Sequence, residues 1–140
     1  MSTEEETNVA MLRDAYTDWH NSRGGSVDHW VSLMADEIAF MSLAQGAQGV
    51  EFTKAMTSKE QVGGYFDGLC SQFEMEHFTV DEYIAQGDRV VAIGSTAWTN
   101  RATGKRVETP KVDIFRLRDG KIVSFEEYYD TAGLIACTTC

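Results

Sequence analysis

The sequence has little proline, little cysteine and no long apolar run. Pro110 is the only proline, and the three cysteines are Cys70, Cys137 and Cys140. An odd number of cysteines without regular spacing indicates a reducing compartment, not a disulfide-stabilised secreted domain. No apolar stretch approaches the length that spans a bilayer. The first residues, Met-Ser-Thr-Glu-Glu-Glu, are acidic where a signal peptide would be basic and then apolar. We therefore expect a cytoplasmic protein.

Basic residues are also scarce. Twelve Lys and Arg stand against 22 Asp and Glu, which gives a formal net charge of -10. Nucleic acids and anionic membranes both favour clustered Lys and Arg, so neither is an expected partner. The 140 residues suffice for one domain over residues 1–140. Within it we expect an acidic N-terminal tail over about 1–6 and a C-terminal tail over about 135–140. Cys137-Thr-Thr-Cys140 has CxxC spacing, but no helix follows to lower a thiol pKa, so we expect a frayed end.

Helical periodicity dominates the first half of the chain. Residues 4–22 place Val9, Leu12, Tyr16 and Trp19 on one face, which predicts a helix that ends at the following glycine pair. A second, short helix is expected over about 26–34, and a short strand over 38–43. Residues 44–57 carry turn residues and weak periodicity, so they are expected to form a loop, either a lid or a flexible connection. A third helix follows, with Ser58 as its N-cap in a Ser-x-x-Gln capping box.

From Glu76 the period of the apolar residues changes from 3.6 to 2. Four sequential strands are predicted, over 76–84, 90–99, 106–118 and 121–129. Turns separate them at 86–88, 101–105 and 118–121. The only proline lies within the third of these strands, where we expect an edge position or a bulge. Helices first and antiparallel strands second predict an α+β fold, with three N-terminal helices packed on a curved, mostly antiparallel sheet.

The last two strands form the most informative stretch of the sequence. Asp119-Gly120 suits a two-residue hairpin turn, because both residues tolerate positive φ. The second strand then carries Glu126 and Glu127 side by side. Since a strand alternates its faces, one of the two glutamates has to point away from solvent or toward a cavity. Glu127 shares its parity with Val123, Phe125 and Tyr129.

The layout resembles the cone-shaped fold of nuclear transport factor 2, ketosteroid isomerase and the SnoaL-like polyketide cyclases. The resemblance covers nearly the whole chain. It is carried by Ala35-Asp36-Glu37, Gly87-Asp-Arg-Val-Val91, Thr103-Gly-Lys105 and the stretch from Phe115-Arg-Leu-Arg-Asp-Gly-Lys-Ile122 through Tyr128-Tyr-Asp130. It implies a homodimer formed through the sheet. The fold serves isomerases, hydrolases, cyclases and binding proteins alike, so it does not name a function.

Two activities of this fold can be compared position by position. Ketosteroid isomerase, a worked example of an Asp base with a Tyr–Asp oxyanion hole, is matched at Tyr16, but its base position falls at Ser42 and its oxyanion Asp near Pro110. Limonene epoxide hydrolase is similar in using an Asp–Arg–Asp set with Tyr and Asn. Its C-terminal acid aligns with Glu127. Its other positions fall near Gly94, Thr96, Phe40 and Ser42, so its Arg, second Asp, Tyr and Asn are expected to be missing, and neither activity is expected as those groups perform it.

Glu127 is the candidate catalytic residue. If its face lines the cone, burial in an apolar pocket would raise its pKa and suit it to acid–base work. The alternative is that Glu127 is solvated and Glu126 pairs with an arginine such as Arg116. Asp113 is expected to face the opposite side, with a second acid in the cavity as the alternative. Tyr16 either donates into the pocket or is a core tyrosine.

The expected pocket is mostly apolar. Its predicted lining is Tyr16, Trp19, Phe40, Ser42, Phe66, Thr96, Trp98, Phe125 and Tyr129, the aromatic members of which also belong to the core. His20 is expected at the surface near the end of the first helix. His29 and His77 have no acidic or cysteine partner at ligand spacing, so we expect no metal, and nothing in the sequence requires a cofactor.

Two functions follow from these patterns. The first is an isomerase, hydrolase or cyclase acting on a small, mostly apolar organic molecule, with Glu127 as general acid or base and Tyr16 or Ser42 orienting the substrate. The second is a non-catalytic ligand-binding or dimerisation module of the same fold. The sequence leaves open whether the chain is an enzyme.

Overall fold

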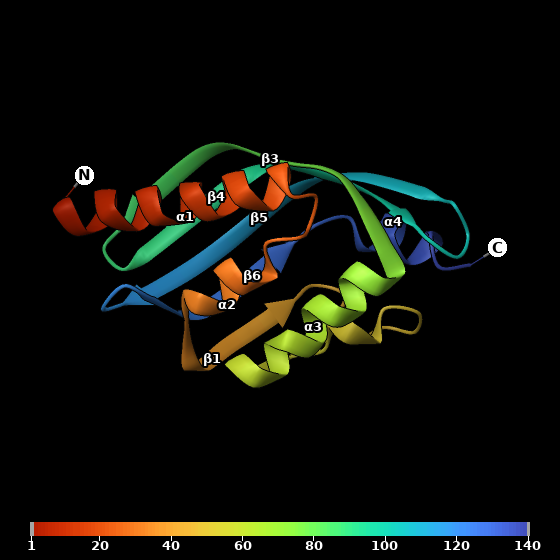
Figure 1. Ribbon diagram of the computed structural model, residues 1–140, viewed down its shortest axis with the longest axis horizontal. Coiled ribbons are helices and arrows are strands. Elements are labelled where there is room, and N and C mark those ends of the chain that lie inside the picture. The colour runs from red at the N-terminus through yellow and green to blue at the C-terminus, as the bar shows by residue number, and fades with distance from the viewer. Residues whose placement is uncertain (1, 140) are drawn as a thin grey trace.

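The computed structural model describes residues 2–139 and is an α+β fold, as the sequence predicted (Figure 1). One curved sheet holds six strands in the order β2-β1-β6-β5-β4-β3. All neighbouring strands are antiparallel except β1 and β6, which are parallel. The strands are β1 Met34–Ser42, β2 Met56–Ser58, β3 Phe73–Gln86, β4 Arg89–Asn100, β5 Arg106–Arg118 and β6 Lys121–Tyr128. The helices are α1 Thr3–Asn21, α2 Val27–Ser32, the short 3₁₀ turn η1 Glu51–Thr53, α3 Lys59–Gln72 and α4 Thr131–Ala136.

The helices pack on the inner face of the sheet. In Figure 1, α1 lies over β3 and β4, whereas α3 lies beside β1. Helix α1 turns Leu12, Tyr16 and Trp19 into the core, as its periodicity predicted. Ser58 is the N-cap of α3, as predicted, and its hydroxyl accepts from the Gln61 backbone N–H. No helix among residues 2–139 has the length and apolarity needed to cross a membrane.

Both expected tails are structured within the described residues. Helix α1 begins at Thr3, where Ser2 and Glu5 form a reciprocal capping box that the sequence analysis overlooked. At the other end, Asp130 is the N-cap of α4, and Cys137, the C-cap of this helix, is buried. The expectation of tails at about 1–6 and 135–140 is therefore wrong over 3–6 and at Cys137. Cys140 lies outside the described residues.

The register of the final hairpin determines which residues lie side by side across neighbouring strands, at one level of the curved sheet. Asp119 and Gly120 have φ of 52° and 76°, which confirms the predicted turn. From this turn the register of β5 and β6 places Asp113 opposite Glu127 and Phe115 opposite Phe125. Parallel pairing then sets Ser42 of β1 beside Glu127. A polar level therefore lies directly above an aromatic level inside the sheet.

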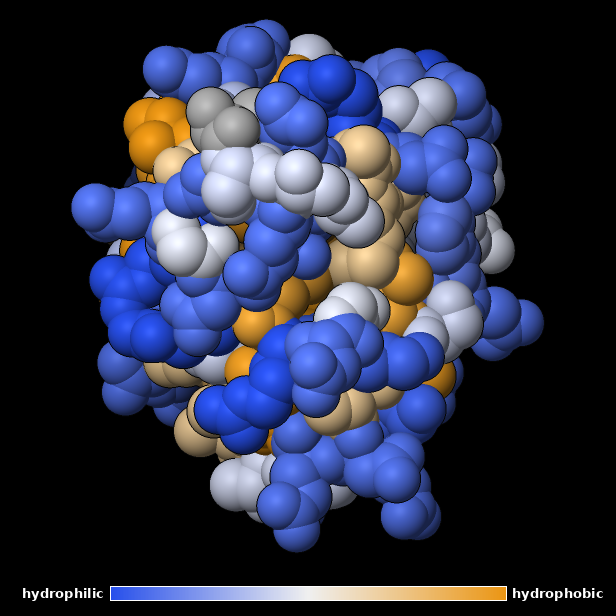
Figure 2. All heavy atoms as spheres, turned by 90° about the vertical axis from the view of Figure 1, so that its left-hand side faces the viewer, coloured by the Kyte–Doolittle hydropathy of each residue, from blue (hydrophilic) through white to orange (hydrophobic). Residues whose placement is uncertain are grey.

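The surface is mainly hydrophilic at the end where α1 begins. Figure 2 shows this end, with charged and polar side chains surrounding a narrow central region of apolar atoms. The apolar side chains otherwise gather between the helices and the sheet, where they form one core cluster.

Candidate functional site

Glu127 points into the cone and is almost completely buried. Only 3% of the surface of this β6 residue is exposed to solvent. Its carboxylate accepts hydrogen bonds from Ser42 Oγ at 2.6 Å and from Tyr65 OH, which lies 3.0 Å from Oε1 and 2.9 Å from Oε2. Glu126 lies on the opposite face and accepts from Tyr128 OH instead. Of the two adjacent glutamates, Glu127 is therefore the one that faces the interior.

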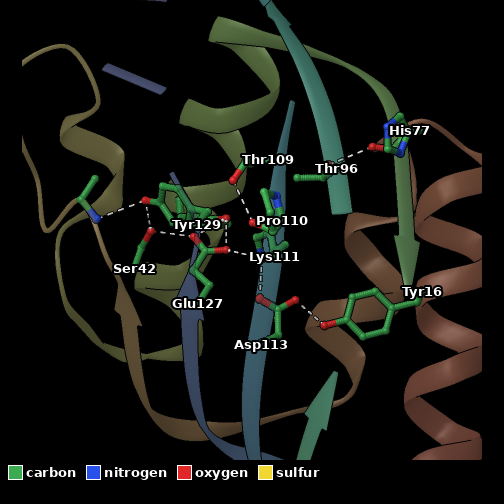
Figure 3. A network of polar contacts seen from close by, with 12 residues as sticks. Tyr16, Ser42, His77, Thr96, Thr109, Pro110, Lys111, Asp113, Glu127 and Tyr129 are labelled. Carbon is green, nitrogen blue, oxygen red and sulfur yellow. Dashed lines mark hydrogen bonds and ion pairs between the residues drawn. The ribbon is translucent and has the colours of Figure 1, made fainter. Parts of the chain in front are cut away.

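A buried lysine joins Glu127 to a second acid. Lys111 Nζ lies 3.0 Å from Glu127 Oε1 and also contacts Asp113 Oδ1 (Figure 3). Lys111 and Asp113 are two apart on β5, so both point to the same face of the sheet. Lys111 is 9% exposed and Asp113 is 2% exposed. We call Lys111, Asp113 and Glu127 the acid–lysine array.

This arrangement corrects two expectations. Asp113 does not face the opposite side of the sheet, because it is buried and accepts a hydrogen bond from Tyr16 OH (Figure 3). The sequence comparison also led us to expect neither a cation nor a second carboxylate beside Glu127. In the structure, Lys111 supplies the cation and Asp113 the carboxylate. The positions compared in the sequence, near Gly94 and Thr96, lie on the neighbouring strand β4. Lys111 and Asp113 lie one strand further along the sheet, on β5.

A tyrosine hydroxyl extends the network toward the chain's loops. Tyr129 OH lies 2.7 Å from Ser42 Oγ and accepts from the Ala44 backbone N–H at 3.2 Å. Ser42 therefore connects Tyr129 with the carboxylate of Glu127, a role that fits its predicted place in the pocket. Tyr65 of α3 completes the set from the helical side. The hydroxyl groups of Ser42, Tyr65 and Tyr129 thus form one hydrogen-bond network with the Glu127 carboxylate.

Burial and charge shift several pKa values in this network. Burial raises the pKa of Asp113; the nearby Lys111 ammonium opposes this shift, and the Glu127 carboxylate adds to it. Burial alone would lower the pKa of Lys111, but the charges of Asp113 and Glu127 outweigh it and raise that pKa. Burial and the neighbouring carboxylates also raise the pKa of Tyr16 and of Tyr65. Lys111 is thus held as a cation, and burial favours the protonated form of Asp113 relative to an exposed aspartate.

Two small cavities lie on either side of the array. The outer cavity has a volume of about 50 Å³, and the inner cavity has a volume of about 40 Å³. The outer cavity is lined by Phe52, Thr53, Tyr65, Leu69, Phe78, Thr96, Trp98, Val107, Thr109, Lys111, Glu127, Tyr129 and Leu134. The inner cavity is lined by Tyr16, Trp30, Met34, Phe40, Tyr65, Phe66, Phe78, Lys111, Asp113, Phe115, Ile122 and Phe125. Only Tyr65, Phe78 and Lys111 line both, and we call these three residues the waist.

The threonines of the outer cavity have hydrogen-bond partners in the backbone. Thr53 Oγ1 donates to the Val50 carbonyl, Thr96 Oγ1 to the His77 carbonyl and Thr109 Oγ1 to the Pro110 carbonyl. Their hydroxyl protons are therefore directed away from a ligand. The polar groups left to meet a ligand in this cavity are concentrated at Lys111, Glu127 and Tyr129.

Most of the predicted pocket residues line one of the two cavities. Tyr16, Phe40, Phe66 and Phe125 line the inner cavity, whereas Thr96, Trp98 and Tyr129 line the outer one. Ser42 reaches the site through its bond to Glu127.

Two predicted positions need correction or detail. Trp19 lines neither cavity, because it packs in the core against Phe66 and Trp98, so its predicted place in the pocket is wrong. His20 is half-buried, and its Nδ1 accepts from the Phe78 backbone N–H.

Sequence reasoning missed Lys111 and Tyr65. The available signal for Lys111 was its spacing, because Lys111, Asp113 and Phe115 share one parity of the strand while Val112 and Ile114 share the other. Tyr65 lies on the buried face of α3 with Val62, Phe66 and Leu69, where a tyrosine is hard to distinguish from a phenylalanine in the core.

Two of the three histidines, His29 and His77, each contact a single acidic side chain. His29 Nδ1 lies 2.7 Å from Asp18 Oδ2, and His77 Nε2 lies 3.0 Å from Glu108 Oε2. Within residues 2–139, no three His, Cys, Asp or Glu side chains cluster closely enough to hold a metal ion.

Solved structures share this fold at low sequence identity. An NTF2-like protein of unknown function from Burkholderia pseudomallei has a TM-score of 0.80 at 20% identity, with 100% of both chains covered. A putative SnoaL-like polyketide cyclase from Jannaschia sp. has a TM-score of 0.72 at 19% identity, covering 99% of this chain and 95% of that one. A protein with a ketosteroid isomerase-like fold from Catenulispora acidiphila, solved in complex with trimethylamine, has a TM-score of 0.72 at 19% identity over 91% of both chains.

The family comparison is more specific than the likeness in fold. Comparison with curated proteins gave no match. The model of the SnoaL-like domain, however, matches residues 12–125, which span the sheet from β1 to the middle of β6 and include Lys111 and Asp113. The chain therefore belongs to the family of SnoaL-like domains.

Proposed function

We propose that this protein is an acid–base enzyme of the hydrolase type that adds water to a small, mostly apolar organic molecule. The observation that carries the proposal is the buried acid–lysine array between two cavities. Two carboxylates and one ammonium carry a formal charge of one negative unit. Because an uncompensated buried charge is costly, the array is expected to hold one additional proton near neutral pH. We place that proton on Asp113, because burial raises the pKa of this carboxyl group and Tyr16 and Lys111 contact its two oxygens.

The roles follow from this proton count. Glu127 is the general base that takes a proton from a water molecule. The water oxygen then bonds to a substrate carbon, and the bond from that carbon to its oxygen breaks. The departing oxygen takes the proton of Asp113, while the Lys111 ammonium stabilises the developing negative charge. The proton on Glu127 must afterwards return to Asp113, and Lys111 contacts both carboxylates.

A strained cyclic ether, an epoxide, is the substrate that such a step fits best. Ring opening needs one proton removed from water and one proton delivered to the ring oxygen, and no other group leaves. The array supplies an acid, a base and a cation within one contact network. The composition is similar to the acid–arginine–acid set of limonene epoxide hydrolase, with Lys111 in place of the arginine and Glu127 in place of one aspartate. Relatives of this fold include a putative polyketide cyclase and a protein that holds trimethylamine, which supports a small-molecule site here.

The test is direct. Purified protein is incubated with cyclopentene oxide, cyclohexene oxide and propylene oxide, and diol formation is followed by gas chromatography. We expect diol from at least one epoxide above the rate without protein, and a rate lower by about a hundredfold or more with Glu127→Gln. Equal rates for the unmodified protein and Glu127→Gln would remove Glu127 as the base.

A non-catalytic ligand-binding module is the second candidate. It is favoured by the small volumes of the two cavities and by the hydrogen bonds that each carboxylate already accepts. In that case Glu127→Gln would retain affinity for an apolar ligand while no epoxide is turned over. Binding without turnover in the unmodified protein would therefore favour this candidate over the enzyme.

We further propose that two copies associate through the outer face of the sheet. The register places Ile84, Val91 and Ile114 in one row across β3, β4 and β5, with Ile93 and Val112 in the next row. Ile84 is 49% exposed, and the other four side chains are half-buried. Contiguous apolar side chains on an uncovered sheet face are typical of a protein interface.

Light scattering after size-exclusion chromatography tests this association. We expect a dimer for the unmodified protein and a monomer for Ile93→Lys, because a lysine placed in the apolar row would be desolvated in the interface. Asp67→Lys, an exposed change on α3 away from this face, is the control and should remain dimeric. A monomeric unmodified protein at micromolar concentration would refute the proposal.

A further inference from the structure

We propose that the carbon skeleton of the substrate lies in the inner cavity, that the attacking water lies in the outer cavity, and that Phe125 sets the size of the skeleton. The substrate is then a compact, neutral molecule that consists of a hydrocarbon skeleton and a single oxygen atom. This inference rests on the proposed function and deepens it by naming the substrate class and the residue that selects it.

The acid and the base open to different cavities. Glu127 and Tyr129 line the outer cavity, whereas Asp113 and Tyr16 line the inner one. Lys111 lines both, at the waist. A molecule protonated by Asp113 must therefore present its oxygen from the inner side, and a water deprotonated by Glu127 must approach from the outer side. The two reactants meet at Lys111.

The polarity of the inner cavity supports this division. Apart from Lys111 and Asp113 at the waist end, its walls are aromatic or aliphatic. The hydroxyl of Tyr16 donates to Asp113, and that of Tyr65 donates to Glu127, so neither hydroxyl proton is free for a ligand. A ligand can satisfy one oxygen there, at Asp113 and at the remaining N–H of Lys111. Any second polar group would lie against carbon and lose its hydrogen bonds.

The charge of the array argues for a neutral ligand. With one proton on Asp113, the two carboxyl groups and Lys111 sum to zero. An ammonium or carboxylate ligand would then bring an uncompensated charge among aromatic rings, at a high cost in desolvation. An alcohol, ether or ketone oxygen carries no such cost.

Phe125 is placed to limit the length of the skeleton. It lies one level below Glu127 on β6, with its ring 5.2 Å from that of Phe40 and 5.1 Å from that of Phe115. The rings of Phe40, Phe115 and Phe125 all line the inner cavity. A smaller side chain at Phe125 would extend the cavity directly beneath the array. Leu134 of α4 is the matched position in the outer cavity, because it is apolar and lines that cavity alone.

The experiment measures the affinity of non-reacting alcohols by isothermal titration calorimetry. Cyclopentanol and cyclooctanol are titrated into the unmodified protein, Phe125→Leu and Leu134→Ala. We expect the unmodified protein to prefer cyclopentanol, and Phe125→Leu to shift the ratio of the two affinities toward cyclooctanol by about tenfold or more. Leu134→Ala should leave this ratio unchanged. Thermal unfolding is measured for each variant, and Phe125→Met serves as a second variant should Phe125→Leu fail to fold.

Several outcomes would overturn the inference. A ratio that changes in Leu134→Ala and not in the Phe125 variants would place the skeleton in the outer cavity. Tighter binding of cyclopentylamine than of cyclopentanol would show that the array keeps a net negative charge and prefers cations. Absence of cyclopentanol binding to the unmodified protein would also refute it.

These results are separate from those that test the proposed function. If the alcohols bind with the expected size selection but no epoxide is hydrolysed, the proposed function fails and the assignment of the inner cavity stands. If an epoxide is hydrolysed and its size preference responds only to Leu134, the function stands and the assignment fails.

Discussion

Replacing Lys111 by methionine is expected to lower the free energy of unfolding by about 3–5 kcal/mol near pH 7. Methionine has a volume and flexibility close to those of lysine, so the loss comes from the charge. Lys111 is the cation that contacts both buried carboxylates, at 3.0 Å from Glu127 Oε1 and in direct contact with Asp113. Without it, two acids would share a site with no counter-charge. Chemical denaturation followed by tryptophan fluorescence gives the free energy.

The deficit caused by Lys111→Met should depend on pH. The charge of Lys111 opposes the rise in the pKa of Asp113, so its removal raises that pKa further. A carboxyl group whose pKa is raised in the folded state stabilises the fold at low pH and loses this contribution as the pH rises through the folded-state pKa. The variant should therefore be closest to the unmodified protein in mild acid and furthest from it at neutral pH.

An exposed lysine supplies the control. Lys59 on α3 pairs with Asp36 at 3.8 Å, and both side chains are partly or fully exposed. Lys59→Met should change the free energy of unfolding by less than about 1 kcal/mol, because surface ion pairs contribute little. Equal stabilities of Lys111→Met and the unmodified protein at neutral pH would mean that the array is solvated or that both of its carboxyl groups are protonated, and would contradict the charge assignment made above.

The hairpin that carries Glu127 could be predicted because its signals are local. Asp119-Gly120 defines a turn by its own backbone preferences, and a fixed turn determines every pair along β5 and β6. The burial of one of two adjacent glutamates follows from strand alternation. The sequence left open which of the two glutamates is buried, and in the structure it is Glu127, which shares its parity with Phe125.

The other half of the array could not be predicted, because its strand reverses the usual pattern. On β5 the polar Lys111 and Asp113 face inward, while the apolar Val112 and Ile114 face outward and are half-buried. A reader of the sequence assigns apolar residues to the core and Lys and Asp to solvent. That rule selects the wrong face here. It fails because the cone interior holds a polar network and because the outer face of the sheet is itself apolar.

Pro110 lies in an inner strand, although proline is normally confined to edge strands and bulges. It was expected at an edge or a bulge, but β5 is an inner strand and Pro110 pairs with Ser95 without a shift in register. The ladder between β5 and β6 begins only at Val112. Pro110 therefore lies where β5 has β4 as its ladder partner, so its missing N–H removes no hydrogen bond to β6. Topology decides this point, and topology depends on contacts that the sequence does not display locally.

The largest expected effects on activity come from the two carboxyl groups, and pH separates their roles. Glu127→Gln should lower kcat for the best epoxide by about a hundredfold to ten-thousandfold at every pH, because the amide cannot accept a proton from water. Asp113→Asn should lower kcat by a similar factor near neutral pH. The measurement is kcat/KM across the pH range for each protein.

The profile of the unmodified protein should decline as the pH rises through the raised pKa of Asp113, because the reaction needs the protonated acid. Asp113→Asn has no carboxyl group to deprotonate there, so its residual activity should lack this decline. Glu127→Gln should retain the decline in whatever activity remains. Glu126→Gln, which removes an adjacent carboxylate on the opposite face, is the matched control and should leave both rate and profile unchanged. A decline that persists in Asp113→Asn would assign the acid to another residue, and Tyr16, which donates to Asp113, would be the first to examine.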